Sequence, residues 1–545
     1  MDINSFKNKL STVSQSKNIP ELIMTAFLGI LMLVQRFLTG GYKPVMDDWF
    51  LYGDLYTNTA DRIKEFAIPN EKFSIRPFAG VFDCFVNAPL FRHIWIAQLL
   101  VTLALLVGAF LIIRTLRRNN AAGAGFFMCI LCLFPVGFEA TYWLAAATRV
   151  CYSLLFIGAA IFALDNYYKS RRTGSLILYA VLGLISVGFY EPAIVIYVIL
   201  TMFIIWNNYK DKKTLIPVII LSAQICLIGL YYILNSGAGE IESRGGIVEN
   251  NFMEHAALVA QYIKDIFLTK SVELMKNGFS KGLLVILGGH KFIKLAGLLV
   301  LSLGFGIFSA LCIKKRRFSF KILALGIALF FSGIILNFVL GSDRIPLRLV
   351  YFSYLGIGIV IDEILMLLPY KLSRILCAPA LTFFAFIFTI AGIGEVCDYQ
   401  KTSDFDVYIT QQLIDLDTPE RITDVNKNTY LFGGQHSYEE TRCIHYLDHI
   451  RGASGNYADI TGCMRHLTNV PFTNSIAAFT YGDTQIMKPY IDQEGLCNFY
   501  NIEYDKTVVR VDLVSDGENY SVIREDGSLV GTLIKVDDVS YQFFN

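Results

Sequence analysis

The chain has 545 residues, of which 54% are hydrophobic and 17% are charged, whereas a soluble globular protein carries about 25% charged residues. Its net charge of +1 hides an asymmetry, because residues 1–394 contain 36 Lys and Arg against 22 Asp and Glu, and residues 395–545 contain 11 against 24. The chain has no Lys/Arg-rich arm and no basic patch interleaved with aromatic residues, which argues against a nucleic-acid partner. These features indicate an integral membrane part followed by a polar, acidic domain.

Eleven stretches are apolar enough, or nearly so, to cross the hydrocarbon region as helices of about 20 residues. The fifth and sixth form one apolar run that Glu191-Pro192 interrupts. Because Pro fits the first turn of a helix and not its interior, we predict a tight hairpin with Glu191 at its tip; one long kinked helix is the alternative. The predicted spans are 20–39, 94–113, 121–138, 143–165, 174–190, 192–207, 214–235, 292–312, 320–340, 349–369 and 375–394.

Basic residues in the short loops predict the orientation, because Lys and Arg stay on the cytoplasmic side of a membrane. We therefore expect a multi-pass protein of the bacterial inner membrane, with a cytoplasmic N-terminus and an extracytoplasmic C-terminal domain. The first span lacks a following cleavage site and is expected to remain as an anchor. Six basic sites alternate strictly along the chain, at Lys7/Lys9/Lys17, Arg114/Arg117/Arg118, Lys169/Arg171/Arg172, Lys210/Lys212/Lys213, Lys314/Lys315/Arg316/Arg317 and Lys371/Arg374.

Two outer loops are long, at 40–93 and 236–291. Within the second, residues 252–275 mix apolar and charged residues in a pattern typical of an amphipathic helix on the membrane surface. A helix packed on its own loops would give the same pattern.

Ionisable residues gather at the predicted outer ends of the spans, where they are costly and therefore functional candidates. Paired carboxylates can supply a general base that deprotonates a hydroxyl nucleophile, and the planar fork of Arg suits phosphate. The acid pair could equally be a helix N-cap and interfacial anchor, and an Arg could merely pair with an Asp to close the bundle. The candidates are Asp47, Asp48, Arg76, Glu139, Arg149, Glu191, Asp343, Arg344 and Arg348.

Three short motifs carry a family resemblance: Asp47-Asp48-Trp49, Arg76 in the first outer loop, and Tyr190-Glu191. With them, residues 20–394 resemble the GT-C type of membrane glycosyltransferase, and are most similar to the bacterial GtrII-like glucosyltransferases. The resemblance implies transfer of a sugar from a polyprenyl-phosphate carrier to an acceptor outside the cytoplasm, with Asp47 or Asp48 as the catalytic base. It implies no nucleotide-sugar site, and no Gly-rich phosphate loop is present on the cytoplasmic side.

Residues 395–545 are expected to form a mixed α/β domain. A helix is predicted at 407–416, and strands at 429–434, 507–514, 520–524 and 528–536, with Asp516-Gly517 and Asp526-Gly527 as hairpin turns. A metal site is one interpretation of the four histidines His436, His445, His449 and His466. Because no third ligand occurs at a suitable spacing, a solvated helix face is the favoured interpretation. Four cysteines, Cys397, Cys443, Cys463 and Cys497, allow three disulfide pairings.

The sequence thus predicts an all-α polytopic membrane protein of about 11 transmembrane helices, GT-C-like, in residues 1–394, with a small α/β extracytoplasmic domain at 395–545. The expected function is transfer of a sugar from a polyprenyl-phosphate-linked donor to a surface glycan or teichoic-acid-like polymer. In this scheme Arg76, Arg344 and Arg348 stabilise the leaving phosphate, and Glu191 and Glu139 orient sugar or acceptor. No metal ligand is assigned, and a divalent cation is left open as a cofactor. The alternatives are a glycan polymerase or ligase, a flippase or transporter of lipid-linked saccharides, and a non-enzymatic envelope protein.

Overall fold

The computed structural model describes residues 19–53, 59–68, 73–121, 123–210, 214–235, 252–288, 292–316, 318–338, 347–416, 428–434, 457–468, 476–479, 482, 484–486, 497–538 and 540–544. The chain divides into two compact units. The helical unit comprises Met1–Gly41, Phe66–Phe82 and Ile96–Val396, and the sheet unit comprises Tyr42–Glu65, Asp83–Trp95 and Cys397–Asn545. Two segments of the predicted first outer loop therefore group with the C-terminal residues.

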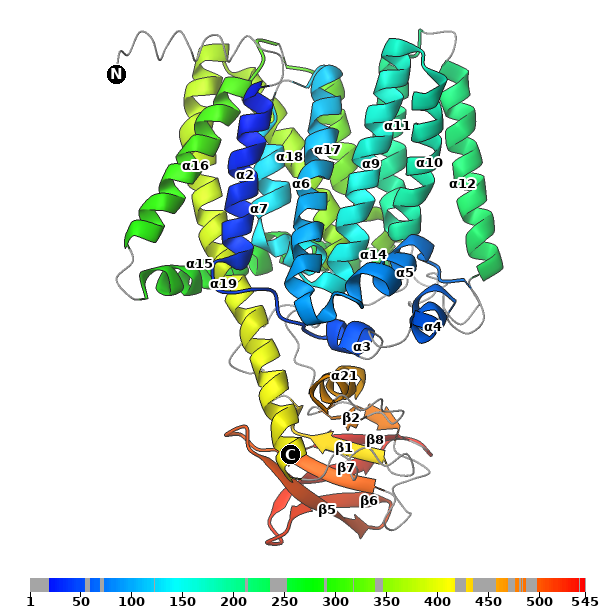
Figure 1. Ribbon diagram of the computed structural model, residues 1–545, viewed down its shortest axis with the longest axis vertical. Coiled ribbons are helices and arrows are strands. Elements are labelled where there is room, and N and C mark those ends of the chain that lie inside the picture. The colour runs from blue at the N-terminus through cyan, green and yellow to red at the C-terminus, as the bar shows by residue number, and fades with distance from the viewer. Residues whose placement is uncertain are drawn as a thin grey trace. The chain divides into compact units, whose positions relative to one another are not determined.

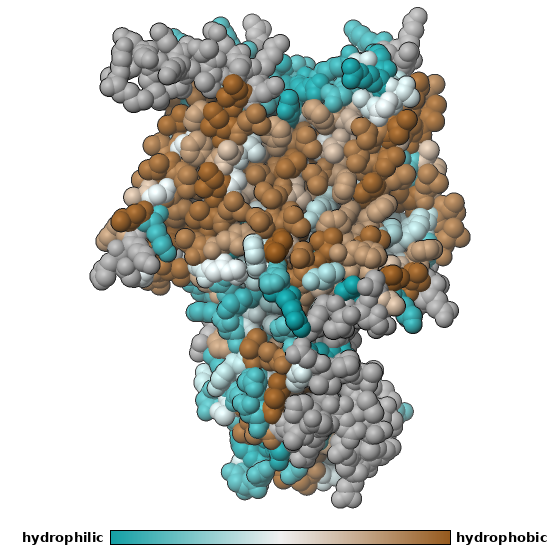
Figure 2. Space-filling view, in the orientation of Figure 1, coloured by the Kyte–Doolittle hydropathy of each residue, from teal (hydrophilic) through white to brown (hydrophobic). Residues whose placement is uncertain are grey.

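In the helical unit, long apolar helices lie side by side (Figure 1), and their surface forms a broad hydrophobic band (Figure 2). Seven helices of the described part of the chain are long and apolar enough to cross a membrane, and three shorter apolar helices accompany them. Nine of the eleven predicted spans match these helices closely, whereas the helix of the span predicted at 320–340 ends at Ser332; the multi-pass membrane prediction is confirmed. The helices are α2 (Ile19–Phe37), α6 (Ile94–Arg118), α9 (Leu144–Ser170), α10 (Thr173–Phe189), α11 (Ile194–Asn207), α12 (Leu215–Asn235), α16 (Phe292–Cys312), α17 (Phe320–Ser332), α18 (Leu347–Ile364) and α19 (Tyr370–Leu416).

The third predicted span, 121–138, is wrong in length. Its helix α7 (Gly125–Leu133) has nine residues, all buried, and is too short to cross the hydrocarbon region alone. Pro135 begins the 3₁₀ turn η5 (Pro135–Gly137), and α8 (Phe138–Thr141) follows. A broken helix at membrane depth is tolerated where surrounding protein satisfies its backbone groups.

The predicted hairpin at Glu191 is confirmed. The helices α10 and α11 are joined by the 3₁₀ turn η6 (Glu191–Ala193), with Pro192 in its first turn. The rings of Tyr179 and Tyr197, one on each helix, lie 6.1 Å apart. One long kinked helix could not bring these two residues together.

The predicted amphipathic segment also forms helix, as α14 (Phe252–Asp265), the π turn η8 (Ile266–Lys270) and α15 (Ser271–Leu287). The helix α15 packs closely on α19, because a Cβ atom added at Gly282 would lie 1.9 Å from the Ile390 carbonyl oxygen. Val272 and Leu284 are exposed, as expected of a helix at a membrane surface. The other short elements of this unit are the helix α5 (Pro77–Phe82) and the 3₁₀ turns η9 (Ile335–Phe338) and η10 (Leu365–Leu367). The π turn η1 (Ile63–Ala67) begins in the sheet unit and ends in the helical unit.

The sheet unit contains an eight-stranded sheet in the order β2-β1-β4-β5-β6-β7-β8-β3. Strand β1 is parallel to β2 and β4, and the other neighbours are antiparallel. Both predicted hairpin turns are confirmed, with Gly517 and Gly527 at positive φ between β5, β6 and β7. The strands are β1 (Asn428–Phe432), β2 (Ile476–Ala478), β3 (Thr484–Ile486), β4 (Cys497–Ile502), β5 (Val508–Asp516), β6 (Asn519–Arg524), β7 (Leu529–Lys535) and β8 (Ser540–Phe544).

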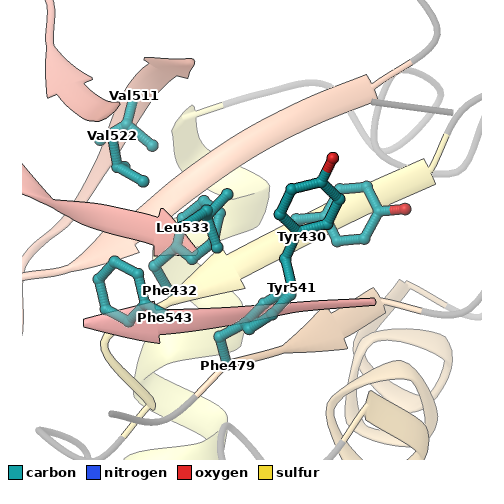
Figure 3. Packing of buried hydrophobic residues seen from close by; sticks show 8 residues of the cluster. All are labelled: Tyr430, Phe432, Phe479, Val511, Val522, Leu533, Tyr541 and Phe543. Carbon is teal, nitrogen blue, oxygen red and sulfur yellow. The ribbon is translucent and has the colours of Figure 1, made fainter. Parts of the chain in front are cut away.

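Aromatic and aliphatic side chains from five strands and from the end of β2 form the core of this sheet (Figure 3). Its residues are Tyr430, Phe432, Phe479, Val511, Val522, Leu533, Tyr541 and Phe543. The unit also contains helices α3 (Asp47–Gly53), α4 (Thr59–Arg62) and α21 (Tyr457–Thr468), the turns η3 (Asp83–Asn87) and η4 (Phe91–His93), and the C-terminal part of α19, which includes the predicted helix at 407–416. Each of the three disulfide pairings considered from the sequence uses Cys463. In the structure Cys463 is a buried free thiol in α21, so none of the three pairings is complete.

Candidate functional site

The acid pair begins helix α3 of the sheet unit. Met46, the residue before it, has a φ of 51°, in the left-handed region that non-glycine residues seldom adopt. Such strained backbone is found at functional sites more often than elsewhere. The strain fixes the direction in which the chain enters α3 and therefore where the two acids point.

The two acids have different surroundings. Asp48 is fully buried; its Oδ2 accepts hydrogen bonds from the Tyr42 hydroxyl and from the Val45 backbone N–H, the latter at 3.2 Å. Asp47 is only partly buried. Asp48 therefore holds the turn that precedes α3, whereas Asp47 is open to solvent and to a substrate.

Trp49 anchors α3 within the sheet unit. Its indole Nε1 donates to Asp406 Oδ2 of α19 at 3.1 Å, and its ring lies 5.7 Å from His466 of α21 and 6.0 Å from Phe91. Burial lowers the pKa of His466, and the positive charge of Arg92 lowers it further. The sequence motif of two acids and a Trp is thus a structural unit in which only Asp47 is left accessible.

A second buried acid of the sheet unit, Asp83, was missed by the sequence analysis. It is fully buried, and its Oδ1 accepts hydrogen bonds from the Tyr52 hydroxyl and from Asn87 Nδ2, both at 2.8 Å. Its sequence neighbours, Phe82 before it and Cys84-Phe85 after it, are apolar, and an acid within an apolar run is a signal for a buried carboxylate. Its bond to Tyr52 ties the C-terminal end of α3 to η3.

In the helical unit, Arg76 and Glu191 form a bidentate ion pair. Arg76 Nε and Nη2 donate to the two carboxylate oxygens of Glu191 at 2.5 and 2.6 Å. Burial would lower the pKa of Arg76, but the Glu191 carboxylate raises it above its ordinary value. About a fifth of each side chain, 24% and 19%, stays exposed, so the pair is ionised and within reach of a ligand.

A second pair, Glu139 with Arg348, lies at the start of α18. Arg348 Nη1 donates to Glu139 Oε1 at 2.9 Å, and the Leu347 backbone N–H donates to Oε2 at 3.0 Å. Glu139 is buried, whereas 32% of the Arg348 side chain is exposed. Glu139 thus joins α8 to the N-terminal end of α18.

Tyr190 connects the two pairs. The guanidinium of Arg76 lies 5.0 Å from the centre of the Tyr190 ring. The Tyr190 side chain also interacts electrostatically with Arg348 and Glu139. The ring of Phe352, on α18, packs 5.8 Å away. Four of the predicted site residues, Arg76, Glu139, Glu191 and Arg348, are therefore neighbours around one buried tyrosine.

For one of the other three predicted residues of this unit, Arg149, a backbone contact is described, and the remaining two lie outside the described residues. Arg149 is half-buried in α9, where its Nη1 donates to the backbone oxygen of Ala145. Asp343 and Arg344 lie outside the described residues.

Arg36, near the C-terminal end of α2, is a charged residue that the sequence analysis did not single out. It is fully buried, and its Nη1 donates to Thr102 Oγ1 and to the Thr141 backbone oxygen, both at 2.9 Å. Among the described residues, its Nε and Nη2 have no hydrogen-bond partner. An arginine within a predicted span was itself the signal, because such charges are functional candidates by default.

An apolar groove of about 390 Å³ lies beside Arg76 in the helical unit. The Tyr231 and Tyr232 hydroxyls of α12 donate to the Ser74 and Ile75 backbone oxygens, at 2.5 and 3.3 Å, and so fix the segment that precedes Arg76. The groove can accept a hydrocarbon chain whose polar end meets the ion pair. It is lined by Ile75, Pro77, Phe78, Leu184, Val187, Gly188, Leu227, Ile228, Tyr231 and Tyr232.

No cluster of three or more metal-binding side chains occurs among the described residues. Three of the four histidines considered from the sequence, His436, His445 and His449, lie outside that part of the chain. The fourth, His466, packs against aromatic rings.

No protein family and no curated protein matches this chain. The solved structures that are similar to it include ArnT from Cupriavidus metallidurans bound to undecaprenyl phosphate, with a TM-score of 0.35, 15% identity and coverage of 85% of this chain and 86% of that one. They also include the same protein in the apo state, with a TM-score of 0.33, 14% identity and 85% coverage of both chains. TM-scores below 0.5 do not establish a shared fold.

Proposed function

We propose that this protein is a membrane glycosyltransferase of the GT-C type, which transfers a sugar from a polyprenyl-phosphate-linked donor to a surface glycan or polymer. The observation that carries the proposal is the Arg76–Glu191 pair beside an apolar groove in a polytopic helical unit. A polyprenyl phosphate is an apolar chain that ends in an anion, and both parts of it have a counterpart here.

The arginines would serve the leaving group. As the acceptor oxygen attacks the anomeric carbon, the bond from that carbon to the phosphate oxygen breaks and the phosphate keeps the electron pair. Arg76 and Arg348 each keep part of the side chain exposed, and guanidinium groups bind phosphate through two parallel hydrogen bonds. Glu191 and Glu139 hold these arginines in place and would also orient sugar or acceptor hydroxyls.

For the base we favour Asp47 over Asp48. The acceptor hydroxyl must lose its proton to a carboxylate within hydrogen-bond reach. Asp48 is buried and already accepts two hydrogen bonds, whereas Asp47 is partly exposed. We assign Asp47 as the base and Asp48 as a positioning residue. The basic loops predict that these acids and the arginines lie on the same, outer side of the membrane.

The test supplies membranes with polyprenyl-phosphate sugars labelled in the sugar. With the protein present, label should move from the lipid fraction into a glycan or polymer fraction, and Arg76→Gln should abolish this movement. Arg524→Gln is the matched control, since Arg524 pairs with Glu503 in the sheet unit and has no proposed role. Label that stays on lipid, with protein folded in the membrane, would refute the proposal; label that crosses the bilayer while still on its lipid would indicate a flippase.

A further inference from the structure

A second groove, of about 390 Å³, lies between α16 and the N-terminal part of α19, and none of the residues proposed for transfer lines it. Both helices belong to the helical unit at this point and are long and apolar enough to span a membrane. The groove is lined by Ile307, Ala310, Leu311, Tyr370, Lys371, Arg374, Ile375 and Ala378.

Most of the groove wall is apolar and open to the bilayer. Ile307 and Ile375 on its two sides are 41% and 67% exposed. On the inner side the helices approach closely, because a Cβ atom added at Gly306 would lie 2.5 Å from the Ala378 carbonyl oxygen. A molecule that fills this groove therefore enters from the lipid phase.

Two cations stand at one end of the groove. Arg374 is fixed against the wall, with Nε donating to the Ala310 backbone oxygen at 3.0 Å and Nη1 to the Tyr370 hydroxyl at 3.3 Å. Lys371 is exposed, and within the described ranges it forms no ion pair. Arg374 still has Nη2 to offer, so both residues can donate to one anion.

Further charged side chains of both signs lie near this end, and Asp362 interacts electrostatically with Arg117 and Cys377. Arg117 pairs with Glu21 at 2.8 Å, and Lys314, two residues after α16, donates to the Arg117 backbone oxygen at 2.9 Å. Burial lowers the pKa of Lys314 to about 8, and the charge of Arg117 contributes.

We propose that the α16–α19 groove is a binding site for an anionic phospholipid, with an acyl chain in the groove and the headgroup phosphate on Lys371 and Arg374. Basic pockets between transmembrane helices on the cytoplasmic side are suited to such headgroups. A zwitterionic phospholipid offers the same chain and phosphate, but its own cation opposes the two basic residues. The site is independent of the proposed transferase activity.

The test titrates the purified full-length protein in neutral detergent with phosphatidylglycerol and, separately, with phosphatidylcholine, and counts bound lipids by native mass spectrometry. Phosphatidylglycerol should bind more tightly, and Lys371→Gln with Arg374→Gln should weaken it by about 30-fold, since each basic residue near an anionic lipid is worth about fivefold. Lys321→Gln with Arg172→Gln is the matched control, because it removes one Lys and one Arg elsewhere and should leave binding unchanged.

Three results would overturn the proposal: equal affinity for the two lipids, a double variant no weaker than the control, or displacement of phosphatidylglycerol by inorganic phosphate alone. The last would mean a bare anion site without a chain. If the Arg374 change disturbs folding, Lys371→Gln alone should still give about a fivefold loss, because that side chain is exposed.

Discussion

At the scale of single residues, the neighbours Asp47 and Asp48 illustrate how one step along a helix changes the role of a carboxylate. The turn at Met46 directs Asp48 toward Tyr42 and the Val45 N–H, and leaves Asp47 partly exposed. The sequence placed both acids at the candidate site but could not rank them, because their burial depends on a tertiary turn.

This difference predicts opposite phenotypes for two similar substitutions. Asp47→Asn should lower sugar transfer by about 10²- to 10⁴-fold, the usual worth of a general base, with thermal stability unchanged. Asp48→Asn should lower the melting temperature, because it weakens a buried acceptor, at a cost of about 1–3 kcal/mol. Asp526→Asn, an acid in an exposed hairpin turn, should change neither activity nor stability. An inactive Asp48→Asn beside a fully active Asp47→Asn, both folded, would reverse the assignment.

The Arg76–Glu191 pair invites a double-mutant test. Arg76→Gln leaves a largely buried carboxylate without its partner, so it should lower both stability and transfer. Adding Glu191→Gln should restore most of the stability and none of the transfer, if the arginine holds phosphate. Recovery of transfer in the double variant would mean that the pair is only structural. The readouts are the melting temperature and the labelled-sugar assay.

His466 predicts a pH dependence of stability. Its folded-state pKa lies below the ordinary value of about 6.5, so the unfolded chain binds protons more readily than the folded chain. This contribution to stability is complete above pH 6.5 and is lost as the pH falls from there through the folded-state pKa. Melting temperatures between pH 7.5 and 5 should therefore decline less for His466→Phe than for the natural chain. Parallel declines would exclude His466 as the cause.

At the scale of elements, the sequence predicted what local chemistry decides. The Pro192 break, the hairpins at Gly517 and Gly527, and the long apolar helices are all found. The short helix α7 was not predicted, because the apolar run continues through Pro135 and hydropathy cannot tell a buried broken helix from a spanning one. The parallel pairing of β1 with β2 and β4 could not be predicted from the sequence either, because it joins segments far apart in the chain.

The contact between α15 and α19 depends on glycine. A methyl group at Gly282 would meet the Ile390 carbonyl oxygen at 1.9 Å, whereas one at Gly297 of α16 would meet nothing within 4 Å. We expect Gly282→Ala to destabilise the protein by about 1–3 kcal/mol, as overpacking does. Gly297→Ala should be neutral or slightly stabilising, because alanine favours helix. Equal melting temperatures for the two variants would contradict this packing.

At the scale of the whole molecule, the net charge of +1 is the sum of a basic helical part and an acidic C-terminal part. The alternation of basic loops predicts that the sheet unit is outside the cytoplasm. Protease added to spheroplasts should then remove an epitope tag at the C-terminus and spare one at the N-terminus. Protection of the C-terminal tag until the membrane is lysed would reverse the predicted orientation.

The short helix α7 has a consequence for how the protein is made. Two N–H groups of its first turn, those of Phe126 and Phe127, donate to Asp362 of α18 at 3.2 and 2.9 Å. Gly358 of α18 lies so close that a Cβ atom there would stand 2.5 Å from Phe127 Cα. During synthesis, α7 leaves the ribosome more than 200 residues before these partners exist. We therefore expect α7 to reach its final position only once α18 has entered the membrane, and not helix by helix in chain order.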